Sequence, residues 1–157
     1  MENIIGSNWR FQHIGAIVRD MDMALKYYAS LGIFTIQPET PPAPGTPAIA
    51  VYEVYGKTPT TTSRAKLRNA YIGPHRFELI SPTPGSPLFE EFLNKKGEGI
   101  HHIAFAVDDL DAEVEKLKAK GIPAVMRMKR TDGRGIAFFD LSQYGGVFIE
   151  LTSMVAR

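Results

Sequence analysis

An internal repeat is the feature that most constrains the fold of this chain. Residues 11–33 match residues 100–122 without a gap, at the offset of 89 positions that separates His13 from His102. Each copy begins with the alternation of a strand, continues into an amphipathic helix and ends at a glycine. Such a repeat predicts two structural modules of the same kind within one chain.

A second pair of matching segments extends the repeat. Residues 77–82 (FELISP) are similar to residues 148–153 (FIELTS), and the match aligns Glu78 with Glu150. Each half therefore opens with a strand that carries a histidine and closes with a strand that carries a glutamate. The first half is the longer one, and the Pro-, Gly- and Thr-rich stretch 38–63 is expected to hold its extra residues.

Both halves carry the same order of strand and helix patterns. The expected strands of the first half are 11–18, 33–37, 66–72 and 76–80, with 48–55 as an added or extended strand. Those of the second half begin at His101 and continue at 122–128, 135–140 and 147–152. Three helices are expected. The first begins after Asp20 or Asp22, the second ends near Gly97, and the third spans 110–120.

The alternation within the strands predicts which side chains share a sheet face. His13 and Gly15 lie on one face of the first strand, and Ala16 and Val18 lie on the face that packs on a helix. Because one helix covers only one face of a four-stranded sheet, two such modules can join their uncovered faces. The prediction is an α+β fold in which two tandem βαβββ modules form a shared curled-sheet cup.

These modules are expected to form a single domain over residues 1–157. Module 1 spans 9–82 with its insertion at 38–63, a linker helix lies within 83–98, and module 2 spans 99–153. Strand parity then places His13, His102 and Glu150 on the face that lines the cup, and Glu78 joins them if its strand has the orientation of its repeat partner.

Composition excludes several classes of partner. The net charge is +1, which gives no reason to expect a nucleic acid or a membrane surface as partner. There is no cysteine, so disulfides, thiolate metal sites and cysteine nucleophiles are excluded. The N-terminus has no signal-peptide pattern, and no apolar stretch reaches the roughly 20 residues that a membrane span needs. We therefore expect a soluble, cytoplasmic protein with a small-molecule substrate.

Two histidines and two glutamates at matching repeat positions indicate a metal site. Imidazole nitrogen and carboxylate oxygen together suit Zn²⁺, Ni²⁺, Co²⁺, Mn²⁺ or Fe²⁺. A divalent metal held by four protein ligands keeps positions open for water or substrate oxygens. Such an ion can polarise a carbonyl and stabilise the enolate formed when a neighbouring C–H loses its proton.

Other polar residues have less specific patterns. His101 points away from His102 by strand parity and is expected to have a structural or supporting role, and His75 is expected at the surface. A basic group near the loop 131–135 either binds a substrate carboxylate or phosphate or is simply solvated. It consists of Arg127, Lys129, Arg130 and Arg134.

Four motifs resemble the vicinal oxygen chelate superfamily, which includes glyoxalase I, methylmalonyl-CoA epimerase, extradiol dioxygenases and bleomycin-resistance proteins. They are HIGAIVRDMDMALKYY, FELISP, GIHHIAFAVDDLDA and VFIELT. The resemblance is greatest to the epimerase and glyoxalase branch. It implies one divalent metal in the cup, often a homodimer, and metal ligands at His13, Glu78, His102 and Glu150.

The resemblance also implies a function. It indicates a metal-dependent isomerase, epimerase or lyase that acts through an enolate on a small carbonyl or thioester substrate. Glu150 or Glu78 then leaves the metal to act as the base. A sequestering protein of the bleomycin-resistance type and an extradiol-type dioxygenase are the alternatives. The epimerases of this family have a second acid/base, usually a glutamate, where this chain has Asn69, and Glu53 is a candidate to replace it.

Overall fold

The computed structural model describes residues 6–39, 44–59, 65–144 and 146–153. The chain divides into two compact units. Unit 1 consists of Met1–Gln12, Pro47–Pro59 and Ile103–Arg157, and unit 2 of His13–Thr46 and Thr60–His102. Strands β1 (Arg10–Ile17) and β6 (Gly99–Ala106) contribute residues to both units.

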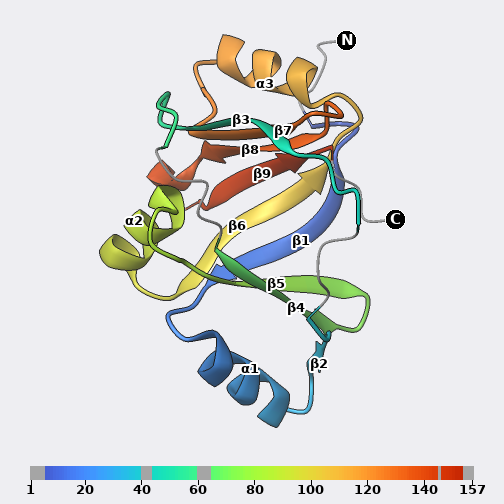
Figure 1. The fold of residues 1–157 in the computed structure, drawn as a ribbon, viewed down its shortest axis with the longest axis vertical. Helices are drawn as coiled ribbons and strands as arrows, with labels where there is room; N and C mark the ends of the chain where they lie inside the picture. The colour runs from blue at the N-terminus through green and yellow to red at the C-terminus, as the bar shows by residue number, and fades with distance from the viewer. Residues whose placement is uncertain (1–5, 40–43, 60–64, 145, 154–157) are drawn as a thin grey trace. The chain divides into compact units, whose positions relative to one another are not determined.

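Unit 2 contains the strands that carry the first repeat. They are β2 (Thr35–Ile36), β4 (Lys66–Ile72) and β5 (His75–Ser81), together with the later part of β1. β5 pairs in parallel with β1 and antiparallel with β4, and β4 pairs antiparallel with β2 (Figure 1). The expected strand at 33–37 is thus confirmed in type but is shorter. A turn at Gly73 and Pro74 joins β4 to β5.

Helix α1 (Met21–Ser30) covers one face of these strands. Asp20 begins it, because the Asp20 carboxylate accepts a hydrogen bond of 2.9 Å from the backbone N–H of Met23. Ala16 of β1 and Val18, which follows the strand, form a buried cluster with Met21 of the helix. The predicted helix face of β1 is therefore confirmed, and His13 and Gly15 lie on the other face.

The predicted linker helix is α2 (Pro87–Lys96). Proline in its first turn suits a helix start, because the N–H that proline lacks has no partner there. Leu88 is buried, and the rings of Phe89 and Phe92 contact the imidazole of His101 at centroid distances of 5.3 and 4.9 Å. The helix thus supports the start of β6.

Unit 1 contains an antiparallel group of strands. They are β3 (Ile49–Val54), β7 (Met126–Arg130), β8 (Gly135–Asp140) and β9 (Phe148–Thr152), with the short helix η1 (Ser142–Tyr144) before β9. β9 pairs with β8, β8 with β7 and β7 with β3 (Figure 1). The strand expected at 122–128 begins later, because Ile122 hydrogen-bonds back to Leu117 at the helix end.

Helix α3 (Leu110–Ala119) packs on β8 and β9 in unit 1. Its apolar side chains Val114 and Leu117 join Phe139 and Leu151 in one buried cluster. Phe105 packs against this cluster and Val107 belongs to it, as the strand parity of the second repeat predicts. None of the described helices is long and apolar enough to span a bilayer.

The order of the nine strands reflects the repeat. Hydrogen bonding connects them as β2-β4-β5-β1-β6-β9-β8-β7-β3. The first repeat follows the path β1-β5-β4-β2, and the second follows the equivalent path β6-β9-β8-β7. The predicted α+β fold with two βαβββ repeats is therefore confirmed. β3, which comes from the insertion of the first repeat, is an addition at the edge beside β7.

Candidate functional site

His13 and His102 come together in unit 2. The Nε2 atom of His13 lies 3.2 Å from the Nε2 atom of His102, and both residues are buried. Their rings meet edge to face, with centroids 5.2 Å apart. The two equivalent positions of the repeat therefore place their ring nitrogens at one point, as the sequence predicts.

Gly15 makes room for this pair. A Cβ atom at Gly15 would lie 2.0 Å from Cε1 and 2.3 Å from Nε2 of His102. No side chain fits at that distance, so the imidazole of His102 occupies the space beside the bare backbone of β1. Gly15 of the first repeat therefore leaves space for His102 of the second.

Glu78 lies beside the two histidines. Its Oε2 atom is 3.4 Å from Nε2 of His13, and β5 places it in register with Gly15. Burial by itself would raise the pKa of Glu78. The hydrogen bond from His13, together with the neighbouring imidazoles and the Arg76 guanidinium, holds that pKa below its ordinary value. Glu78 is therefore a carboxylate at neutral pH.

Arg76 is a site residue that sequence reasoning missed. It is the register partner of His13 on β5, and its Nη2 atom donates a hydrogen bond to Nδ1 of His13. The available signal was its position two residues before Glu78, because residues i and i+2 of a strand share a face. The site therefore contains a permanent positive charge as well as the ligand set.

His101 supports His102 from the other side. Its Nδ1 atom lies 2.9 Å from Nδ1 of His102, although strand parity predicted that His101 points away. The contact is possible because Nδ1 is the ring nitrogen nearer the backbone, so adjacent imidazoles can meet across the strand. Burial, together with the charge of His102, lowers the pKa of His101 to about 3, so its imidazole is neutral.

The fourth expected ligand, Glu150, belongs to unit 1. It lies on β9, is buried, and has Phe138 of β8 as its register partner. His13, His102 and Glu150 are all buried, and each offers an atom that can ligate a metal. A buried carboxylate needs a cation or hydrogen-bond donors to compensate its lost hydration.

The donor set of unit 2 fits a divalent metal. A metal-bound histidine usually donates its second ring N–H to an acceptor. His102 meets this condition, since its Nδ1 faces Nδ1 of His101 and leaves Nε2 for a ligand bond. Nε2 of His13 lies 3.2 Å from that atom, and Oε2 of Glu78 lies 3.4 Å from Nε2 of His13. Imidazole nitrogen and carboxylate oxygen are the borderline and hard donors that such ions prefer.

Asn69, at the position of the family's second acid/base, and Glu53, its candidate replacement, lie in different units. β4 carries no carboxylate, and its Asn69 is the register partner of Glu78. Glu53 lies on β3 in unit 1, where it is exposed and in register with Arg127 of β7. Among the described residues of unit 2, Glu78 is thus the carboxylate that adjoins the histidine pair.

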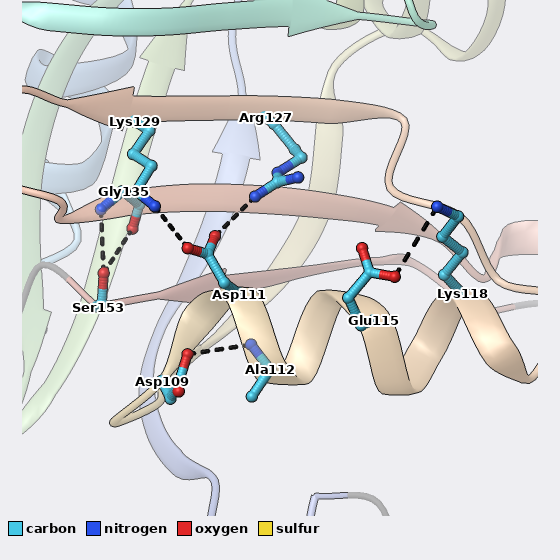
Figure 2. Close-up of polar contacts among 9 residues, drawn as sticks. All are labelled: Asp109, Asp111, Ala112, Glu115, Lys118, Arg127, Lys129, Gly135 and Ser153. Carbon is cyan, nitrogen blue, oxygen red and sulfur yellow. Dashed lines mark hydrogen bonds and ion pairs between the residues drawn. The ribbon is translucent and has the colours of Figure 1, made fainter.

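Three of the four basic residues near the loop 131–135 form ion pairs within unit 1. Figure 2 shows Asp111 of α3 between Arg127 and Lys129 of β7, with contacts of 2.7 and 2.5 Å. Arg134 pairs with Asp132 at 2.6 Å. Of the two interpretations of this group, the structure favours a paired surface over a binding site for a substrate anion.

Comparison with known proteins agrees with this geometry. The model of the glyoxalase/bleomycin resistance protein/dioxygenase superfamily matches residues 12–138, which include both histidines and Glu78. The chain belongs to this superfamily. The resemblance of its four sequence motifs to the vicinal oxygen chelate proteins is thereby confirmed.

Relatives within the superfamily include named epimerases. Human mitochondrial methylmalonyl-CoA epimerase is 26% identical over 157 residues, which cover 96% of this chain and 79% of the human protein. An uncharacterized protein of Bacillus subtilis, YqjC, is 28% identical over 147 residues and 90% of each chain. The crystal structure of methylmalonyl-CoA epimerase from Mycobacterium tuberculosis is 25% identical, with a TM-score of 0.60 over 91% of this chain and 86% of that one.

Proposed function

We propose that this protein is a divalent-metal-dependent isomerase, epimerase or lyase that moves a proton next to a carbonyl group of a small substrate. The observation that carries the proposal is the convergence of His13, His102 and Glu78 in unit 2, with Nε2–Nε2 and Nε2–Oε2 distances of 3.2 and 3.4 Å. Its membership of the superfamily supports it, since named relatives of the chain include methylmalonyl-CoA epimerases.

In this proposal the metal ligands are His13, Glu78, His102 and Glu150. Glu150 is included because the repeat aligns it with Glu78 and because its carboxylate is buried. A bound divalent ion, whether Zn²⁺, Ni²⁺, Co²⁺, Mn²⁺ or Fe²⁺, would supply a Lewis acid that polarises a carbonyl oxygen and favours loss of the neighbouring proton. The protein residues then have to accept and return that proton.

Glu78 and Glu150 are the proposed proton carriers. Because the pKa of Glu78 is held below its ordinary value, Glu78 starts as a base rather than as an acid. Asn69 faces Glu78 in register on β4, and its amide can orient a substrate oxygen but cannot take a proton in this pH range. Either Glu78 or Glu150 is therefore the proposed base, and position 69 supplies no second carboxylate in register with Glu78.

The relatives suggest a first substrate to test. Methylmalonyl-CoA is the substrate for which the epimerase relatives are named, and its thioester carbonyl adjoins an acidic C–H. The protein is incubated with methylmalonyl-CoA in D₂O and each of the five metals in turn. Deuterium exchange at the carbon next to the carbonyl needs only one base, so this assay detects proton removal even without inversion of configuration at that carbon. Exchange is expected with metal and should fall strongly in the variants Glu78→Ala and Glu150→Gln.

The outcomes separate the alternatives. Metal uptake without deuterium exchange, together with tight binding of the unchanged thioester, would favour a sequestering protein. No uptake of any of the five metals would overturn the metal-dependent proposal. Glu115→Gln is a suitable matched control, because this glutamate is exposed on α3 and pairs with Lys118. Cytoplasmic location and homodimer formation remain predictions from the sequence and the resemblance.

A further inference from the structure

The contact between Arg76 and His13 limits which tautomer His13 can adopt. A guanidinium has only donors, so Nδ1 of His13 must accept the hydrogen bond from Nη2 of Arg76. A neutral imidazole carries one proton, and that proton must then lie on Nε2 of His13. In this state Nε2 is a donor and has no lone pair for a metal.

The surrounding contacts agree with this tautomer. Nε2–H of His13 has an acceptor in Oε2 of Glu78 at 3.4 Å and another in Nε2 of His102 at 3.2 Å. His102 then carries its proton on Nδ1 and donates it to Nδ1 of His101 at 2.9 Å. Each residue of this series donates a hydrogen bond to the next, in the order Arg76, His13, His102 and His101.

A metal at Nε2 of His13 requires the opposite tautomer. The proton then lies on Nδ1, where it faces the donating guanidinium of Arg76 instead of the acceptor that metal-bound histidines need. The second histidine has no such conflict, because His102 already keeps its lone pair on Nε2. The obstacle to metal binding is therefore confined to one ligand and one neighbour.

We propose that Arg76 is a positioning residue that opposes metal binding through His13, and that its guanidinium must leave Nδ1 before His13 can ligate. This inference rests on the proposed metal site and adds to it a residue that regulates metal binding. Arg76 lies on the same strand face as Glu78, so an anionic group of a substrate is a suitable alternative partner for the released guanidinium. Metal and an anionic substrate should then bind cooperatively.

The tautomer can be tested first, without any metal. In chelator-treated, ¹⁵N-labelled protein, long-range ¹H–¹⁵N spectra distinguish a protonated Nε2 from a protonated Nδ1. The four histidines are assigned with the single variants His13→Gln, His75→Gln, His101→Gln and His102→Gln. His13 is expected with its proton on Nε2 in the natural protein and on Nδ1 in Arg76→Gln, whose amide oxygen can accept it. A proton on Nδ1 of His13 in the natural protein would overturn the inference.

Metal affinity provides the second test, with Co²⁺ alone as the probe. Arg76→Gln removes the charge and adds an acceptor, Arg76→Met removes the charge only, and Arg76→Lys keeps both the charge and the donor. We expect Co²⁺ to bind Arg76→Gln about tenfold or more tightly than the natural protein. Arg76→Met should be intermediate and Arg76→Lys close to the natural protein. Equal affinity of the Gln and Met variants would show a simple charge effect and contradict the inference.

The result also distinguishes this inference from the proposed function. Equal Co²⁺ affinity in all four proteins would overturn the role of Arg76 and leave the metal site intact. Binding by Arg76→Gln alone would support the role of Arg76 and explain a metal-free natural protein. If Co²⁺ binds to none of the four, although thermal unfolding shows that all are folded, the metal site and the role of Arg76 both fail.

Discussion

The Nε2 atoms of His13 and His102 lie 3.2 Å apart, although 89 positions separate the two residues in the chain. That separation is the offset of the internal repeat, so equivalent strands of two similar modules place equivalent side chains at one point. Glu78 completes the group in unit 2 from the strand beside β1. This local environment explains the effects expected for the His102, Gly15 and His101 variants below.

Replacement of His102 by alanine should abolish metal uptake. The change removes the one ring whose Nε2 keeps a lone pair while its Nδ1 donates to His101, so the remaining donors cannot enclose an ion. Isothermal titration with Co²⁺ and elemental analysis measure the loss. His75→Ala is the matched control, since His75 is exposed on β5, and full metal content in His102→Ala would refute the site.

Substitution of alanine at Gly15 should displace the imidazole of His102. The added methyl group would lie 2.0 Å from Cε1 of that ring, well inside contact distance, so the ring must move or the strand must shift. We expect at least a tenfold loss of Co²⁺ affinity, roughly the loss seen when a ligand's orientation is disturbed. Gly73→Asn is the control, because the turn there is open and asparagine accepts its positive φ. Unchanged affinity in Gly15→Ala would contradict the packing of His102.

His101 should make the metal-free protein less stable in mild acid. Its pKa is about 3 when folded and near 6.5 when unfolded, so between these values the unfolded state binds more protons. The free energy of unfolding should therefore fall as the pH drops from about 6.5 towards 3, by up to about 1.4 kcal/mol for each unit of pKa difference.

Urea unfolding at several pH values measures this slope. His101→Phe replaces the buried imidazole by a ring that also suits its neighbours Phe89 and Phe92, and it should reduce the slope. His75→Gln should leave the slope unchanged, because His75 is exposed. An identical slope in His101→Phe and the natural protein would show that the imidazole of His101 is not held neutral.

The hydrogen bond between Trp9 and Glu113 should stabilise unit 1. The indole Nε1 atom of Trp9 donates to Oε2 of Glu113 at 3.0 Å, and Glu113 is only 3% exposed. Trp9→Phe keeps the aromatic ring but removes the donor to a buried carboxylate, which should cost about 1–3 kcal/mol in urea unfolding. In a Glu113→Gln background the same change should cost less, and an equal cost in both backgrounds would mean that lost packing explains it.

The ion pairs of Asp111 should contribute little. Asp111 is exposed, and its pKa is lowered mainly by the hydrogen bond from Lys129. Asp111→Asn removes both contacts drawn in Figure 2, yet exposed pairs are typically worth less than about 1 kcal/mol and weaken as salt rises. Urea unfolding at low salt and in about 1 M NaCl tests this, since the salt should screen the pairs almost fully. A larger loss that persists in salt would indicate a structural role for the Asp111 contacts.

The sequence by itself determined the repeat, the order of strands and helices, and the positions of His13, His102 and Glu78 in the candidate site of unit 2. Strand alternation and helix periodicity are local properties, so the face of β1 that carries His13 and the cap at Asp20 can be inferred without knowledge of distant contacts. The repeat then supplied the long-range part, because it paired His13 with His102 and Glu78 with Glu150.

Only the tertiary structure decided which residues of other strands stand beside these positions. Arg76 reaches Nδ1 of His13 because of the parallel register between β1 and β5, and no local pattern fixes that register. In the same way, β3 pairs with β7 of the second repeat, and Asp111 forms ion pairs with Arg127 and Lys129 of β7. Side-chain neighbours across strands depend on register and on how far a long side chain extends, and both are set by packing rather than by sequence spacing.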